Sequence, residues 1–383
     1  MARSMVIFGL AAALLLSACA SGGPDDGGQR PIAGSAPFNT DGWDTEFSSH
    51  SVPLSEFRSG GPPKDGIASI DDPRFTSTAE ADQFLDPREP VAAVEVAGEV
   101  RAYPIQILIW HEIVNDEIDG EPVAVTYCPL CNSTVAFSRV VDGEPVEFGT
   151  TGMLRNSDLV MYDRATESWW QQITAEAVVG ERTGTRLEVL PSQILSWAEL
   201  RRLHPSARVL SRDTGFDREY GSSPYGGYDS DPGSRPFLLE GEPDRSLPPK
   251  ERVAAVRSGN SAVVYPFSRL SEEAPVSDEV DGEPIVVFFD PGVASALDST
   301  AVAAGRDVGA AAVFERTVDR RVLEFDRGPR PGTFRDRRTG STWDLSGRAT
   351  AGPLEGARLA QVPHDDQFWF ALAAFFEDAE IRE

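Results

Sequence analysis

Two cysteines and one histidine are the residues of this chain whose types and spacing could support chemistry. Cys128 and Cys131 stand in the run Tyr-Cys-Pro-Leu-Cys-Asn, and His111 lies 17 residues before the first of them. Thiolate sulfur and imidazole nitrogen are ligands that suit Cu(I) and Zn²⁺. We therefore predict a copper or zinc site with these three ligands, and with Met161, Met153 or water in the fourth position. A methionine there would favour copper.

Two other interpretations of the same residues stay open. An enzyme could use Cys128 as a redox or nucleophilic thiol that His111 activates. In an exported protein, Cys128 and Cys131 could also form a structural disulfide within a non-catalytic binding module. A zinc ribbon would need a second cysteine pair, which the sequence lacks, and a thioredoxin-like pair would open a helix. The β-branched residues Thr134 and Val135 indicate a strand after the cysteines instead.

The elements that must position these groups are short strands. Apolar and polar residues alternate in many segments, and dipeptides such as Asp119-Gly120 and Asp142-Gly143 separate these segments as hairpin turns do. The cysteines lie between two such segments, where Asn132 can adopt the left-handed conformation of a tight turn. We expect neighbouring strands to bring His111 beside them. The expected strands cover 91–96, 99–103, 123–127, 134–140, 159–162, 168–171 and 186–189, and the expected helices cover 192–203 and 367–376.

A second group of polar residues follows the cysteines. Residues 149–158 are rich in small and polar side chains and are expected to form a long loop between two strands. Such a loop could line a ligand pocket, or it could be a hairpin loop that ends in a structural turn. The side chains that would offer directional contacts to a ligand or cofactor are Asn156, Ser157, Asp158 and Arg164.

A shift of the chain against itself by 162 residues reveals a repeat. Asp119-Gly120-Glu121-Pro122 then meets Asp281-Gly282-Glu283-Pro284, and after a change of offset to about 173 Trp170 meets Trp343. One long period indicates two similar modules rather than a solenoid. We predict a mainly β protein with a few short helices, formed by two tandemly duplicated β modules that pack together. The second module lacks the site, because His111, Cys128 and Cys131 meet Glu273, Asp290 and Val293.

The N-terminal residues are typical of an export signal. Arg3 precedes an apolar run over residues 5–16 that is too short for an ordinary membrane span. Leu16-Ser17-Ala18-Cys19 resembles the bacterial lipobox, in which the cysteine receives acyl chains that anchor the protein. We therefore expect an exported protein that Cys19 attaches to the cell membrane or outer membrane, with its folded part in the periplasm or extracellular space. The predicted parts are a signal peptide (1–18), a lipidated cysteine and flexible tether (19–63), a first module with the Cys/His site (64–212), a connecting loop (213–249) and a degenerate second module (250–383).

The charge balance restricts the partners of the chain. It has 61 acidic and 35 basic residues, a formal net charge of -26. Such a charge repels phosphate backbones, so we expect no nucleic-acid binding. The expected partners are the membrane, through the lipid at Cys19, and a metal ion or small ligand at the Cys/His site.

Several motifs of the chain are distinctive when they are taken together. They are Tyr103-Pro104, Trp110-His111-Glu112-Ile113-Val114-Asn115-Asp116, Thr126-Tyr127-Cys128-Pro129-Leu130-Cys131, residues 156–164 and Asp213-Thr214-Gly215. With these motifs the chain resembles, from about Asp65 to the C-terminus, the bacterial and archaeal family called domain of unknown function 3179. The resemblance implies no particular reaction, because the family has no established activity.

Overall fold

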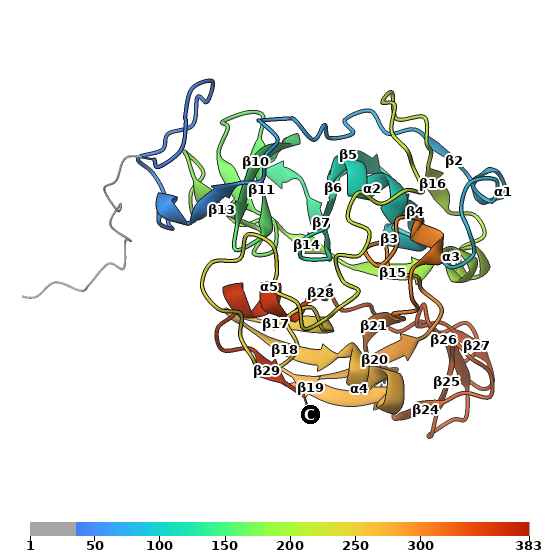
Figure 1. Ribbon diagram of the computed structural model, residues 1–383. Helices are drawn as coiled ribbons and strands as arrows, with labels where there is room; N and C mark the ends of the chain where they lie inside the picture. Colours follow the sequence, from blue (N-terminus) through green and yellow to red (C-terminus); the bar gives the residue numbers. More distant parts are fainter. Residues whose placement is uncertain (1–35, 383) are drawn as a thin grey trace, which may run out of the picture. The chain divides into compact units, whose positions relative to one another are not determined.

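Strands form wherever β-branched and aromatic residues alternate with polar ones, so the chain has the predicted mainly β fold with a few short helices. The computed structural model describes residues 36–382 (Figure 1). The predicted signal peptide, Cys19 and the first part of the tether lie outside these residues. Across the described part of the chain, no helix has the length and apolar character needed to cross a membrane.

One five-stranded sheet of the first half has the order β15-β3-β4-β16-β2. Helix α2 follows β4 directly at Pro104, whose φ of -60° already suits a helix. Three short helices follow strands of this sheet, and all of them are visible in Figure 1. The bounds are β2 Phe75–Ser77, α1 Thr78–Ala81, β3 Pro90–Val96, β4 Glu99–Pro104, α2 Ile105–His111, β15 Ser192–Ser196, α3 Trp197–Leu203 and β16 Arg208–Leu210.

A second five-stranded sheet has the order β1-β10-β11-β12-β13. The long loop expected over 149–158 is wrong, because most of it is strand β10 with a bulge between Thr150 and Leu154. The turn to β11 is limited to Asn156 and Ser157, whose φ values are 50° and 69°. The bounds are η1 Leu54–Glu56, β1 Phe57–Ser59, β10 Phe148–Arg155, β11 Asp158–Asp163, β12 Trp169–Gln171 and β13 Glu176–Val179.

An eight-stranded sheet joins the two halves of the chain. Its order is β29-β18-β17-β28-β7-β6-β5, and β14 also pairs with β7. The junction lies between β28 and β7, where Asp366 is the partner of Thr134. The bounds are β5 Ile113–Ile118, β6 Glu121–Cys128, β7 Ser133–Ser138, β14 Val189–Leu190, β17 Arg252–Ser258, β18 Ser261–Pro266, α4 Phe267–Glu273, β28 Asp365–Phe368, α5 Trp369–Phe375 and β29 Glu380–Ile381.

The remaining strands form smaller sheets. Strands β19, β20 and β21 form one sheet, and β24 to β27 form another. Two short hairpins, β8-β9 and β22-β23, complete the pattern. The bounds are β8 Val140–Val141, β9 Glu144–Pro145, β19 Val276–Val280, β20 Glu283–Asp290, η2 Val302–Ala304, β21 Ala310–Glu315, β22 Thr317–Val318, β23 Arg321–Val322, β24 Phe325–Arg327, β25 Thr333–Asp336, β26 Thr342–Asp344 and β27 Ala349–Ala351.

The two halves run through the same order of elements. The series β3-β4-α2-β5-β6-β7 corresponds to β17-β18-α4-β19-β20-β21, and β15-α3-β16 corresponds to β28-α5-β29. A buried hydrogen bond is repeated as well: Trp170 Nε1 donates to Asp163 Oδ2 at 2.9 Å, and Trp343 Nε1 donates to Asp336 Oδ2 at 3.0 Å. This correspondence supports the interpretation of the chain as a duplication. The module boundaries stay a prediction.

One sequence-based helix prediction needs correction, and two helices were missed. Ser192–Ser196 is strand β15, which pairs with β3, so only the second part of the expected helix over 192–203 is helical. Helices α2 and α4 were not predicted. The first of these is apolar and buried on almost every side, so it lacks the one-sided pattern by which a surface helix is recognised.

Candidate functional site

The two cysteines lie in the turn between β6 and β7. Strand β6 ends at Cys128, and Asn132 takes the predicted left-handed conformation, with φ of 52°, directly before β7. Its backbone N–H donates to Pro129 O at 3.3 Å, which closes the turn. Cys128 and Cys131 are both buried and are not joined in a disulfide.

Asp158, the first residue of β11, completes a compact group with the two thiols. The sulfur atoms of Cys128 and Cys131 and one carboxylate oxygen of Asp158 all lie within 4.8 Å of one another. Oδ2 of Asp158 accepts hydrogen bonds from Gln171 Nε2 at 2.6 Å and from Ile173 N at 3.0 Å. Oδ1 is buried and meets no hydrogen-bond donor with ordinary geometry in the described part of the chain, although the neighbouring Cys131 thiol lies close enough to oppose the rise that burial causes in the pKa of Asp158. One carboxylate oxygen is therefore free to bind a metal ion beside the two sulfurs.

Burial dominates the electrostatics of this group. It raises the pKa of Asp158 to about 6 and raises the pKa of the Cys128 thiol above its ordinary value. The pKa of Cys131 is raised still further, by burial and then by the neighbouring thiol. Several acidic groups thus share a region of low dielectric in which negative charge is costly. A bound cation would remove this cost and would hold the thiols as thiolates.

Glu112 is a functional candidate that the sequence analysis missed. It follows the last residue of α2 with φ of 59°, an unusual conformation for glutamate. Its backbone oxygen accepts a hydrogen bond from Tyr127 N at 2.8 Å, which fixes it beside the strand that carries Cys128. Burial raises the pKa of its carboxyl group to about 8, with a further contribution from Asp158. The only signal in the sequence is its place in the Trp-His-Glu motif of the resemblance.

His111 is not brought into the group of Cys128, Cys131 and Asp158. It is the last residue of α2, and both ring nitrogens have partners elsewhere: Nδ1 lies 2.7 Å from Ala68 O and Nε2 lies 2.7 Å from Tyr220 OH. The physical reason is the unpredicted helix. Its end directs the imidazole toward the segment that contains Tyr220 and away from the thiols, so Asp158 takes the place that we expected for His111.

The two methionines that were predicted as possible fourth ligands occupy different places in the fold. Met161 is buried in β11, where it pairs with Trp170 of β12, and it contributes to the main hydrophobic cluster. Met153 is half-buried in β10 and lines a cleft next to the site. Among the described residues, the group of Cys128, Cys131 and Asp158 supplies two sulfur atoms and one carboxylate oxygen.

The other predicted polar contacts divide into two sets. Ser157 O accepts a long hydrogen bond from Cys128 Sγ at 3.6 Å, so the Asn156–Ser157 turn does reach the thiols. Arg164, in contrast, forms ion pairs with Asp65 at 3.0 Å and with Asp71 at 3.3 Å. These ion pairs connect the end of β11 to the segment that precedes β2. Arg164 thus has a structural role in this arrangement.

A cleft of about 530 Å³ is lined by Leu130, which lies between the two cysteines, and by Leu159, which follows Asp158, but not by the three ligand residues themselves. Glu112 lines it together with parts of the β10-β11 hairpin, the cysteine turn and the segment 224–237. This segment, which we call the covering segment, belongs to the predicted connecting loop and contains no helix or strand. Apolar and aromatic side chains make most of the wall, among them Leu130, Met153, Leu154, Leu159, Tyr225 and Tyr228.

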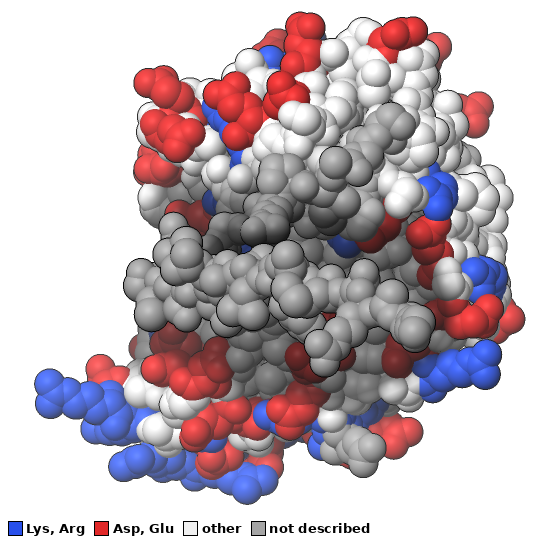
Figure 2. Space-filling model, turned by 90° about the vertical axis from the view of Figure 1, so that its left-hand side faces the viewer, with Lys and Arg blue, Asp and Glu red and all other residues white. Residues whose placement is uncertain are grey.

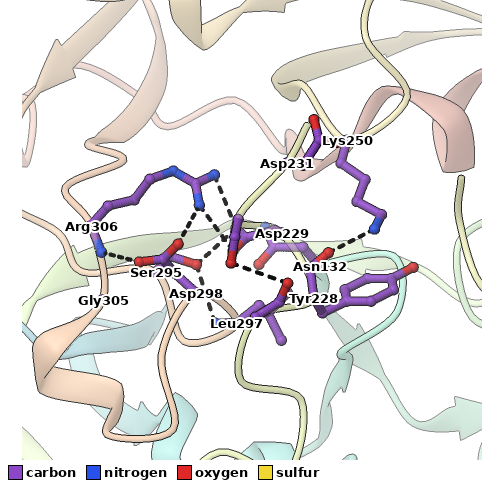
Figure 3. Close-up of polar contacts among 12 residues, drawn as sticks. Asn132, Tyr228, Asp229, Asp231, Lys250, Ser295, Leu297, Asp298, Gly305 and Arg306 are labelled. Atoms are coloured by element: carbon purple, nitrogen blue, oxygen red, sulfur yellow. Dashed lines mark hydrogen bonds and ion pairs between the residues drawn. The ribbon is translucent and has the colours of Figure 1, made fainter. Parts of the chain in front are cut away.

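Residues of the second half hold the covering segment in place. Figure 3 shows Arg306 and Ser295 directed toward Asp229, and Lys250 directed toward the backbone of Tyr228. The carboxylate of Asp229 is fully buried and accepts hydrogen bonds from Arg252 at 2.7 Å, Ser295 at 2.8 Å and Arg306 at 3.1 Å. This network, which we call the Asp229 network, fixes the chain that supplies two tyrosines to the cleft.

Acidic side chains are prominent on the surface as well. On the face shown in Figure 2, Asp and Glu side chains spread over the upper and lower parts, and most of the Lys and Arg side chains in view lie near the lower edge. This distribution agrees with the net charge of -26.

The comparisons with known proteins leave the chemistry of the site open. No curated protein and no solved structure matches the chain significantly. One family model does match, over most of the chain and over both halves. It covers the cysteine turn, Asp158 and Glu112, and the resemblance noted above is thereby confirmed. The chain belongs to the family described as "Protein of unknown function (DUF3179)", whose model matches residues 64–379.

Proposed function

We propose that Cys128, Cys131 and Asp158 bind one metal ion, with zinc preferred over copper, in a protein of the cell envelope. The observation that carries the proposal is that these three buried ligand atoms lie within 4.8 Å of one another. In addition, Oδ1 of Asp158 meets no hydrogen-bond donor with ordinary geometry in the described part of the chain. The sequence alone favoured copper, because it suggested an imidazole and a methionine as further ligands. A carboxylate in their place favours zinc, which accepts sulfur and oxygen together.

The proposed coordination leaves a position for chemistry. Three protein ligands are typical of catalytic zinc sites, in which the fourth position takes water or substrate and the pKa of bound water falls to about 7. Glu112 lines the adjoining cleft and would accept or donate a proton there. We therefore propose a metal-dependent reaction at the cleft, with Glu112 as its acid–base group.

The alternative of a reactive thiol without metal has less support. An activated cysteine needs a lowered pKa, whereas burial raises the pKa of Cys128. The predicted activator, His111, donates from Nδ1 to Ala68 O and is hydrogen-bonded to Tyr220 OH through Nε2. The alternative of a structural disulfide would need an S–S bond between Cys128 and Cys131, and these two thiols are free.

Metal analysis of the full chain, purified from the cell envelope, tests the proposal. We expect one zinc ion per chain in the parent protein and its loss in the Cys128→Ser and Asp158→Asn variants. His111→Gln is the matched control, because it changes a buried residue near the site but leaves the proposed ligands intact. Thermal unfolding of each variant verifies that it is folded. A parent protein without stoichiometric metal, or metal lost in His111→Gln but retained in Asp158→Asn, would overturn the ligand assignment.

We also propose that the chain is exported and anchored through a lipid at Cys19. The support is the lipobox-like run that ends at this residue. Incorporation of labelled palmitate measures the modification directly. We expect labelling of the parent protein and none of Cys19→Ala, and equal labelling of both would refute the anchor.

A further inference from the structure

The cleft beside Glu112 has the size and wall of a small-molecule site. Its volume of about 530 Å³ lies within the range of about 300–1,000 Å³ that is typical of ligand pockets. Leucine, methionine and aromatic side chains from three separate segments form most of its surface. A ligand would therefore gain most of its binding free energy from apolar contact.

The charge of the wall restricts the ligand further. Among the described residues that line the cleft there is no lysine, arginine or histidine, and Glu112 is the one carboxyl group. Lys250 contacts the ring of Tyr228 at 3.9 Å, but it donates to Tyr228 O and Ser234 Oγ and does not line the cleft. A phosphate or carboxylate of a ligand would find no counter-charge there, and its desolvation would be costly.

The carboxyl group of Glu112 has no hydrogen-bond partner among the described residues. The residue as a whole is 8% exposed and is therefore buried. No hydrogen bond from the described residues acts on its carboxyl group, whereas Asp158 nearby receives two. Because Glu112 lines the cleft, its carboxyl group is available to a hydrogen-bonding group of a bound ligand.

We propose that the cleft binds an uncharged, mainly apolar small molecule, one hydrogen-bonding group of which meets the carboxyl group of Glu112. This ligand class rests on the proposed function in one respect: the reacting end of the ligand is assumed to lie at the proposed metal site. Binding of the apolar part depends on the cleft wall and needs no metal. The ligand class and the metal site can therefore fail separately.

Photolabelling of the full chain with two related probes tests this ligand class. Benzophenone is uncharged, and 4-benzoylbenzoate has the same rings with one added carboxylate. We expect benzophenone to label residues of the cleft wall, Met153 in particular, and the carboxylate to label them more than about tenfold less. That ratio corresponds to about 1.4 kcal/mol, less than the cost of burying an unpaired charge. Mapping of labelled peptides by mass spectrometry separates cleft binding from partition into membrane or detergent.

Two variants make the result specific. Leu154→Lys places a cation in the cleft wall and should raise labelling by 4-benzoylbenzoate relative to benzophenone. Val322→Lys adds the same charge at an exposed position and should leave the ratio unchanged. Equal labelling of the parent cleft by both probes, or labelling only outside the cleft, would overturn the proposed ligand class. Benzophenone labelling of the parent protein should be equal before and after treatment with a metal chelator, so failure of the metal proposal would be recognised separately.

Discussion

Removal of the Asp229 carboxylate should destabilise the protein far more than removal of an exposed carboxylate. Asp229 is fully buried, and its partner Arg252 is only 11% exposed, so neither can recover water. Arg306 is 35% exposed and would be partly rehydrated, which lowers the cost. Breaking a buried ion pair from one side costs about 3–5 kcal/mol. We therefore expect Asp229→Ala to reduce the free energy of unfolding by about 3 kcal/mol, near the lower limit of that range.

Urea unfolding of Asp229→Ala beside Asp326→Ala measures this difference. Asp326 pairs with Arg337 at 2.7 Å, but both side chains are more than half exposed, so its loss should leave the free energy of unfolding almost unchanged. In the double variant with Arg252→Met, part of the loss should be recovered, because no unpaired cation then stays buried. Hydrogen exchange of Gly227 N–H, which donates to Asp298 O at 3.0 Å, should also become faster. Equal destabilisation by Asp229→Ala and Asp326→Ala would refute the reasoning.

Three further changes have defined outcomes. Burial raises the pKa of Asp366 to about 6, so the stability linked to its protonated form is complete below about pH 4 and is lost as the pH rises to about 6. The Asp366→Asn variant should therefore be more stable than the parent protein by about 2–3 kcal/mol at pH 7 and equally stable at about pH 3.5. Urea unfolding at both pH values measures this difference. Asn132→Val should cost about 1–2 kcal/mol in the same assay because φ is 52°, whereas Asn132→Gly should cost less, and the reverse order would contradict the left-handed turn. Ser196→Ala removes the side chain that accepts from Glu199 N at 3.2 Å, and a loss of about 1 kcal/mol is expected; no change would mean that this cap contributes nothing.

Much of the strand pattern could be predicted because it depends on neighbours in the sequence. The strand expected over 99–103 is Glu99–Pro104, and that expected over 159–162 is Asp158–Asp163. The segment Ser192–Ser196 was misread because its apolar residues continue smoothly into α3, so one helical period fits both. Its pairing with β3 is a tertiary contact, and no local pattern reports it.

The candidate site was only partly predictable for the same reason. The turn of Cys128 and Cys131 and the conformation of Asn132 follow from local sequence. Asp158 was identified as a polar residue of a ligand site, but not as the partner of the thiols. That contact depends on the position of β11 relative to the turn between β6 and β7. His111 lies closer in the sequence, yet α2 directs it elsewhere.

The second half of the chain lacks the candidate site, but its residues contact the site in the first half. Asp290 ends β20 as Cys128 ends β6, but its Oδ1 accepts a hydrogen bond from Gly332 N at 2.8 Å and no thiol stands beside it. The half without thiols nevertheless supports the site of the other half. Phe368 N donates to Cys131 O at 2.9 Å, and the arginines of the Asp229 network hold the covering segment over the cleft. The proposed site therefore lies in the first half, whereas residues of both halves hold it in place.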